Sequence, residues 1–210
     1  MAPSSSRGEF MEPAPVAITL QVVQALEALG APYFITGSLA SAIHGLARST
    51  LDVDLVADLS PGHEEAFQTA LGDGFYADIE AIREAIHQRG SFNLIHRETM
   101  YKVDVFVSKA RPFDRARFER RSAKVVATDP ERKVFVATAE DVVLAKLEWY
   151  QAGGRVSERQ WRDVLGVLSV QAGRLDLTYL REWASNLRVA DLLERALAEV
   201  GEEGKGHGPP

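Results

Sequence analysis

Residues 33–57, YFITGSLASAIHGLARSTLDVDLVA, decide the fold of this chain. They open with an aromatic and β-branched run that is typical of a short buried strand. Gly37-Ser38 then marks a turn, and a run rich in Ala, Leu and Ile favours a helix. The stretch closes with alternating apolar and polar residues, which place Asp52 and Asp54 on one face of a second strand. The sequence therefore predicts a strand, a turn, a helix and an acidic strand.

The same periodicities predict the remaining elements. Thr138 and Ser157, each followed three residues later by a polar residue, are typical helix N-caps. Helices are expected at residues 16–29, 64–71, 79–87, 139–151, around 161–168, 177–186 and 189–200. Strands are expected at residues 91–96 and 101–107, as a hairpin, and at 124–127 and 134–136.

Length and composition predict one compact unit with mobile ends. The chain has 210 residues, of which 46% are apolar, enough to close a core without disulfides. Both ends are rich in polar residues, Pro and Gly, without apolar periodicity. We expect a disordered tail at residues 1–15, a core at 16–137, a helical region packed on it at 138–200, and a second tail at 201–210.

Several classes of protein are excluded by composition. The chain has no cysteine, which excludes zinc ribbons, iron–sulfur clusters and thiol nucleophiles, so any metal must have mainly oxygen ligands. No signal-peptide pattern and no run of about 18 apolar residues occurs, so we expect a cytoplasmic protein without membrane contact. The net charge of −6 gives no general attraction to nucleic acid. Residues 109–124 are locally basic; this run favours one solvated helix face, with steering of a nucleic-acid acceptor as the alternative.

The acidic residues have the spacing of metal ligands. The α-carbons of Asp52 and Asp54 are expected about 6.5 Å apart on one strand face. Asp104 lies in a second alternating strand and completes the set if the two strands are neighbours. Such a set suits Mg²⁺, with Mn²⁺ as an alternative ion, and two ions would clamp an in-line displacement at phosphorus. Gly37 and Ser38, at a helix start, suit phosphate oxygens.

Each feature alone is more often structural. A D-x-D pair is commonly solvated, and a Gly-Ser turn before a helix is ordinary capping. Arg48 either holds a triphosphate or lies in a loop, and its place ahead of the acidic pair favours the first. The joint occurrence of the turn, the acidic pair and Asp104 favours a functional site.

This combination resembles the polymerase-beta-type nucleotidyltransferase superfamily. The likeness lies in Ile35-Thr36-Gly37-Ser38, with Gly45, Arg48 and Thr50, and in Leu51-Asp52-Val53-Asp54-Leu55. It implies an α+β fold, a mixed β-sheet flanked by helices and followed by a C-terminal helical bundle. It also implies transfer of a nucleoside monophosphate from a nucleoside triphosphate to an acceptor hydroxyl with magnesium. In that likeness Gly37, Ser38, Arg48 and Thr50 bind nucleotide, and Asp52, Asp54 and Asp104 bind metal, Asp104 also matching a general base.

The later chain is similar to the AbiEii-like nucleotidyltransferases, many of which are toxins of toxin–antitoxin pairs. The likeness rests on residues 138–141 leading to Lys146, then Arg159 and Asp163, and implies catalytic roles for Lys146 and Asp163 and an antitoxin partner. Without the likeness, the pattern fits a solvent-directed Lys146 equally well and fits Asp163 as a surface partner of Arg159.

Two questions stay open at this level. The acceptor is a tRNA, a protein or a small molecule, and a non-catalytic nucleotide-binding module with the same fold is the alternative function. The five histidines show no metal-ligand spacing, and the three tryptophans, Trp149, Trp161 and Trp183, are predicted to be core residues.

Overall fold

The computed structural model describes residues 14–45, 52–128 and 131–206, with side chains described for 16–45, 53–126 and 131–201. The strands are β1 (Tyr33–Thr36), β2 (Asp52–Ala57), β3 (Phe75–Tyr76), β4 (Ser91–His96), β5 (Lys102–Val107), β6 (Ser122–Thr128) and β7 (Glu131–Val136). The helices are α1 (Ala14–Ala28), α2 (Gly37–His44), α3 (Glu64–Leu71), α4 (Ile79–Gln88), α5 (Pro112–Arg120), α6 (Ala139–Ala152), α7 (Glu158–Val170), α8 (Leu177–Asn186) and α9 (Ala190–Gly206). A short 3₁₀ turn, η1, covers Gly72–Gly74.

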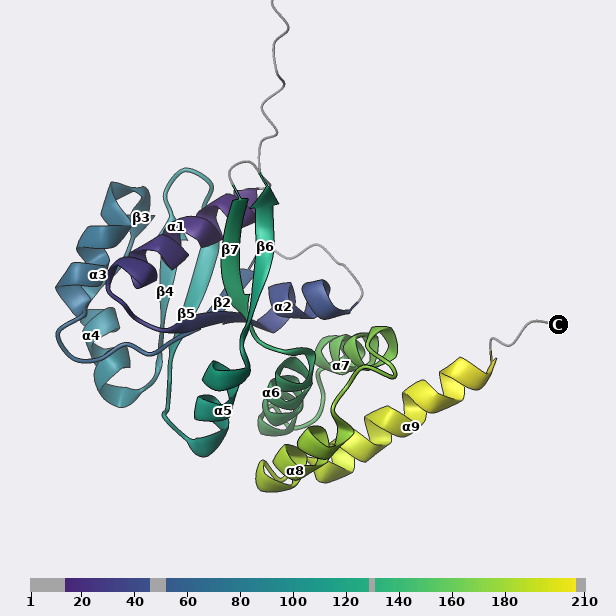
Figure 1. Ribbon diagram of the computed structural model, residues 1–210. Coiled ribbons are helices and arrows are strands. Elements are labelled where there is room, and N and C mark those ends of the chain that lie inside the picture. Colours follow the sequence, from purple (N-terminus) through teal and green to yellow (C-terminus); the bar gives the residue numbers. More distant parts are fainter. Residues whose placement is uncertain (1–13, 46–51, 129–130, 207–210) are drawn as a thin grey trace, which may run out of the picture.

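The strands form one mixed sheet in the order β3-β4-β5-β2-β1-β7-β6 (Figure 1). β2 pairs in parallel with β5 and β1 in parallel with β7, while the other neighbours are antiparallel. The β4–β5 hairpin and the α+β class predicted from sequence are confirmed. The parallel β2–β5 pair is central to the site, because it joins two acidic strands that are far apart in the chain.

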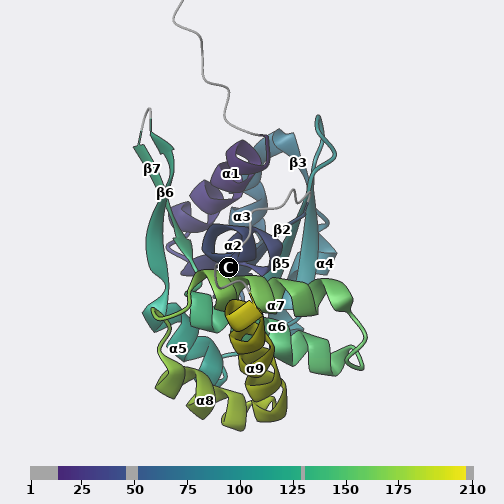
Figure 2. The same cartoon turned by 90° about the vertical axis from the view of Figure 1, so that its right-hand side faces the viewer.

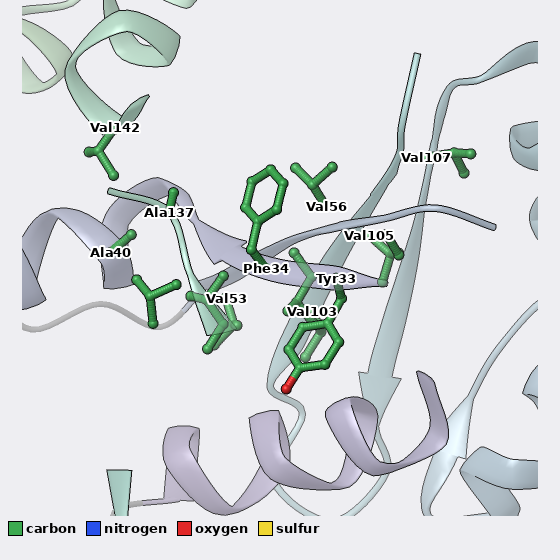
Figure 3. Close-up of a cluster of buried hydrophobic side chains, with 14 of the residues drawn as sticks. Tyr33, Phe34, Ala40, Val53, Val56, Val103, Val105, Val107, Ala137 and Val142 are labelled. Carbon is green, nitrogen blue, oxygen red and sulfur yellow. The ribbon is translucent and has the colours of Figure 1, made fainter. Parts of the chain in front are cut away.

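Alternation along the central strands divides the sheet into two faces. Figure 3 shows Tyr33 and Val103 directed toward α1, while Phe34 and Val56 point to the other side. All four side chains are buried, so the sheet is covered on both faces here. The second face carries the acidic residues, because Asp54 is two residues from Val56.

Helices α6 to α9 pack together at one end of the molecule (Figure 2). Contacts of α2 with α6 and α7 join this group to the sheet. The predicted caps are confirmed: the side chain of Thr138 accepts from the Asp141 amide, and that of Ser157 accepts from the Gln160 amide. Within the described residues, no helix is long and apolar enough to cross a membrane.

The last helix is longer than predicted. α9 continues from Ala190 to Gly206, through six residues that were expected to belong to the C-terminal tail. Glu and Lys are good helix formers, and adding residues to an existing helix is much easier than starting one. Local composition therefore predicted that the helix ends at Val200, whereas the helix, once formed, continues to Gly206.

Candidate active site

The turn between β1 and α2 requires glycine for two reasons. Gly37 has φ +62°, a conformation that residues with a side chain rarely adopt. A Cβ atom at this position would also lie 1.9 Å from Oδ2 of Asp54. The same oxygen accepts a hydrogen bond of 3.4 Å from the Ser38 amide. The predicted Gly37-Ser38 turn is thus in direct contact with the acidic strand.

The register of the sheet places the candidate carboxylates side by side. Asp54 on β2 lies opposite Asp104 on β5 and opposite Thr36 on β1. Paired residues of neighbouring strands are about 4.8 Å apart and point to the same face. Asp52 is opposite Lys102 in the backbone register, and its side chain lies outside the described part. From the sequence, Asp104 joins the acidic set only if its strand is a neighbour of the strand that carries Asp54. The structure shows that the two strands are neighbours.

The two carboxylate oxygens of Asp104 differ in their contacts. Its Oδ2 lies 2.9 Å from Nζ of Lys102, whereas its Oδ1 is buried and makes no hydrogen bond among the described residues. A buried carboxylate oxygen without a partner is costly, and a cation would satisfy it. Lys102 is a site residue that sequence reasoning missed, although its position two residues before Asp104 puts both on one strand face.

The described side chains fit a metal ion only in part. Asp54 and Asp104 supply carboxylate oxygens of the kind that Mg²⁺ binds, since this ion needs few protein ligands and keeps several waters. Among the described side chains, no group of three or more His, Cys, Asp or Glu residues is arranged to hold a metal. Asp52, which lies outside that search, is the residue that would add a third carboxylate.

The helical region also reaches the turn. Nη2 of Arg159, on α7, donates a hydrogen bond of 3.3 Å to the hydroxyl of Ser38. This places a guanidinium, the side chain best suited to phosphate oxygens, beside the start of α2. Arg159 was considered from sequence only as a neighbour of Asp163, because nothing local relates it to a serine 121 residues away.

Solved structures share this architecture at low sequence identity. A comparison with protein-family models gives no match, and neither does one with curated protein sequences. ANT(2'')-Ia in complex with adenylyl-2''-tobramycin matches with a TM-score of 0.51 at 10% identity, over 84% of this chain and 98% of that one. The fold is that of the nucleotidyltransferases.

Two further structures match at slightly lower scores. The antigenic nucleotidyltransferase-like protein from Paracoccidioides brasiliensis has a TM-score of 0.49 at 17% identity, over 88% of this chain and 93% of that one. The lincosamide antibiotic adenylyltransferase LnuA, lincomycin-bound, has a TM-score of 0.48 at 14% identity, over 73% of this chain and 96% of that one.

Within this nucleotidyltransferase fold, Lys146 and Asp163 contact each other. Nζ of Lys146 on α6 lies 2.9 Å from Oδ2 of Asp163 on α7, and each side chain is only 10% exposed. The structure contradicts the solvent-directed interpretation of Lys146. The pair joins two helices of the C-terminal group, and Asp163 follows Arg159 by one helical turn. Arg48 and Thr50, the other predicted nucleotide-binding residues, lie outside the described residues.

The basic run at residues 109–124 is a solvated helix face only in part, because some of its basic side chains are exposed while others are buried or paired with acids. Arg117 is buried, donates a 3.0 Å hydrogen bond to the Thr36 hydroxyl, and has its guanidinium carbon 4.7 Å from the centroid of the Phe34 ring. Burial lowers its pKa from the ordinary value. Arg111 pairs with Asp114 and with Glu148 of α6. Sequence suggested exposure because Glu148, Thr36 and Phe34, which contact these arginines, lie elsewhere in the chain.

The structure shows whether one histidine, His44, and two tryptophans, Trp161 and Trp149, are buried. His44 is buried, with Nε2 2.7 Å from the Ala137 carbonyl oxygen, so it is a structural residue. Trp161 is buried as predicted, but Trp149 is 57% exposed and was wrongly predicted to be core. Two residues along a helix rotate the side chain by about 200°, so Trp149 points away from the side on which Leu147 is buried.

Proposed function

We propose that this chain is a Mg²⁺-dependent nucleotidyltransferase, with Mn²⁺ as an alternative ion. The observation that carries the proposal is the placement of Asp54, which lies beside Asp104 across two parallel strands and against the Gly37-Ser38 turn. Metal ligands and a phosphate-binding turn therefore share one point of the fold. The similarity to ANT(2'')-Ia, a structure in complex with an adenylylated compound, agrees with this reaction class.

Each residue has a distinct proposed task. Asp52, Asp54 and Asp104 would hold the metal, which neutralises phosphate charge when bound. The amide and hydroxyl of Ser38 and the guanidinium of Arg159 bind the triphosphate, with Arg48 and Thr50 assigned the same task by resemblance.

The proposed reaction is a single displacement at phosphorus. The acceptor oxygen forms a bond to the α-phosphorus of the nucleoside triphosphate, the bond from that phosphorus to pyrophosphate breaks, and pyrophosphate leaves. Asp104 takes the proton of the acceptor hydroxyl as a general base. Lys146 and Asp163 join this scheme through the AbiEii-like resemblance; their ion pair supports a role in holding α6 and α7, and hence Arg159, against the turn.

A transfer assay tests this function. Triphosphates labelled at the α-phosphate are incubated with Mg²⁺, a cell extract, and wild type, Asp54→Asn or Asp104→Asn. We expect both variants to lower acceptor labelling by about 100-fold or more. Asp73→Asn, an exposed acid in η1, is the matched control and should label like wild type. Equal labelling by wild type and Asp54→Asn would refute the proposal.

The same proteins distinguish the non-catalytic alternative. A binding module takes up ATP with Mg²⁺ in calorimetry, shows no labelled acceptor in any extract, and loses binding on Asp54→Asn. The intact pair Asp54 and Asp104 argues against it, because binding alone does not need a base next to the metal ligands.

The toxin role is the finer part of the proposal. It rests on the AbiEii-like resemblance and predicts that expression of the chain arrests bacterial growth. Asp54→Asn should abolish the arrest and Asp73→Asn should keep it, and co-expression of an antitoxin encoded next to this gene should restore growth. Arrest by Asp54→Asn at wild-type level would separate toxicity from nucleotidyl transfer.

A further inference from the structure

Phe106 extends the acidic face with an aromatic side chain. Asp104 and Phe106 are two residues apart on β5, so both point to the same face, about 6.5 Å apart along the strand. On the other neighbour, β4, Asn93 lies opposite Asp104 and Ser91 opposite Phe106, and both are exposed. The proposed base therefore has polar, accessible groups on the side away from Asp54.

Trp149 completes this surface from the helical region. Its ring centroid lies 6.1 Å from that of Phe106, in an edge-on arrangement. The indole is 57% exposed, which is unusual for a tryptophan in contact with another ring. The exposed indole and the half-buried phenyl ring, set edge-on to each other, present two apolar ring surfaces beside Asp104. We call Phe106 and Trp149 the aromatic platform.

The charges near the platform disfavour a polyanion. Lys102 is paired with Asp104, and Arg111 is paired with Glu148, the residue before Trp149. Among the residues that the structure describes, these two cations next to the platform are matched by acids, while Asp54 and Asp104 add negative charge. Binding of a nucleic-acid strand depends on cations that neutralise its phosphates.

We infer that the aromatic platform binds the acceptor, and that the acceptor is a small, uncharged or cationic molecule with a hydroxylated ring. The face of the acceptor ring stacks on the exposed Trp149 indole and its edge contacts Phe106, while the Asn93 amide bonds a ring substituent and one hydroxyl is directed to Asp104. This inference rests on the proposed function and narrows its acceptor from three classes to one.

Fractionation of labelled acceptors tests the inference. The cell extract is separated by ultrafiltration into small molecules and retained RNA and protein, and each fraction is offered to the enzyme with labelled triphosphate and Mg²⁺. We expect label in the small-molecule fraction, on a component that an anion exchanger does not retain before transfer. Label mainly on RNA or protein overturns the inference while keeping the proposed function. No label in any fraction contradicts nucleotidyl transfer itself.

Substitutions of Trp149 in the aromatic platform provide a second test of the inference. Trp149→Ala should raise the KM for the labelled component about tenfold or more, with ATP binding in calorimetry and the melting temperature unchanged. Trp149→Phe should recover most of the loss, since it keeps a ring face. Tyr76→Ala is the matched control, because Tyr76 is 52% exposed and lies on the edge strand, beyond β4. An unchanged acceptor KM in Trp149→Ala overturns the inference.

Discussion

Arg117 donates a hydrogen bond of 3.0 Å to the hydroxyl of Thr36, the residue that leads into the Gly37-Ser38 turn. Both side chains are buried, and Thr36 faces Asp54 in the sheet register. The Thr36 hydroxyl makes no capping bond to α2 and instead accepts the hydrogen bond from this cation. A buried guanidinium on α5 therefore holds the residue at which the Gly37-Ser38 turn begins.

Replacing Thr36 with valine should destabilise the protein, because the hydrogen bond from Arg117 is lost. Valine keeps the shape but removes the acceptor and leaves the buried Arg117 Nη2 group without it. Because a hydrogen bond to a charged group contributes about 1.5–3 kcal/mol, we expect the free energy of unfolding to fall by about 2 kcal/mol. Urea unfolding measures it, with Thr36→Ser as the control that keeps the hydroxyl. A loss below about 0.5 kcal/mol would show that Arg117 does not depend on Thr36.

Gly37→Ala should abolish transfer with a smaller effect on stability. The added Cβ would meet Asp54 Oδ2 at 1.9 Å, so the carboxylate must move. A displacement of about 1 Å in a reacting group can cost about 100-fold in rate, and we expect at least that loss of acceptor labelling. Gly72→Ala is the matched control, because Gly72 has φ +65° against +62° at Gly37 but open space around its Cβ position. If both variants lose activity equally, the contact with Asp54 is not responsible.

The Lys146–Asp163 pair should behave as a buried ion pair. Lys146→Met removes the ammonium group from the Asp163 carboxylate, which is 10% exposed, and the expected loss of unfolding free energy is about 3 kcal/mol. The double variant Lys146→Met with Asp163→Leu removes both charges and should be more stable than Lys146→Met alone. A double-mutant cycle by urea unfolding measures the coupling. Strictly additive single losses would contradict a direct interaction.

Stability should fall as the pH drops through the range in which histidine titrates. Burial lowers the pKa of His44 in the folded state, although its bond to the Ala137 carbonyl opposes this in part. In the unfolded chain the His44 imidazole has its ordinary pKa of about 6.5, so below that pH the unfolded chain binds more protons than the folded chain. The contribution of neutral His44 is therefore complete above about pH 7 and is lost as the pH falls below about 6.5.

Comparison of urea midpoints from about pH 8 to pH 5 checks the His44 prediction. The slope should be smaller in His44→Gln, whose amide can still donate to the Ala137 carbonyl. His87→Gln is the control, because His87 is exposed at the end of α4 and should leave the slope as in wild type. An unchanged slope in His44→Gln would show that His44 does not titrate with folding.

The sequence by itself determined the local elements of this protein. Alternation around Asp54 predicts an acidic strand face, and the caps Thr138 and Ser157 predict where α6 and α7 begin, because strand and helix periods and capping depend on residues a few positions apart. Gly37 was also identifiable, since a Gly-Ser turn between a strand and a helix is a local pattern.

Only the tertiary structure decided which of these residues meet. Asp54 and Asp104 are 50 positions apart, and the parallel pairing of β2 with β5, which no local pattern specifies, brings them into register. The basic run looked exposed because the groups that bury Arg117 lie on other elements, and Trp149 looked buried because its helix has a buried side. Pairing and burial depend on how whole elements pack. For this reason the acidic strand could be predicted from the sequence, whereas the positions of Asp104, Arg117 and Trp149 relative to it were decided by the fold.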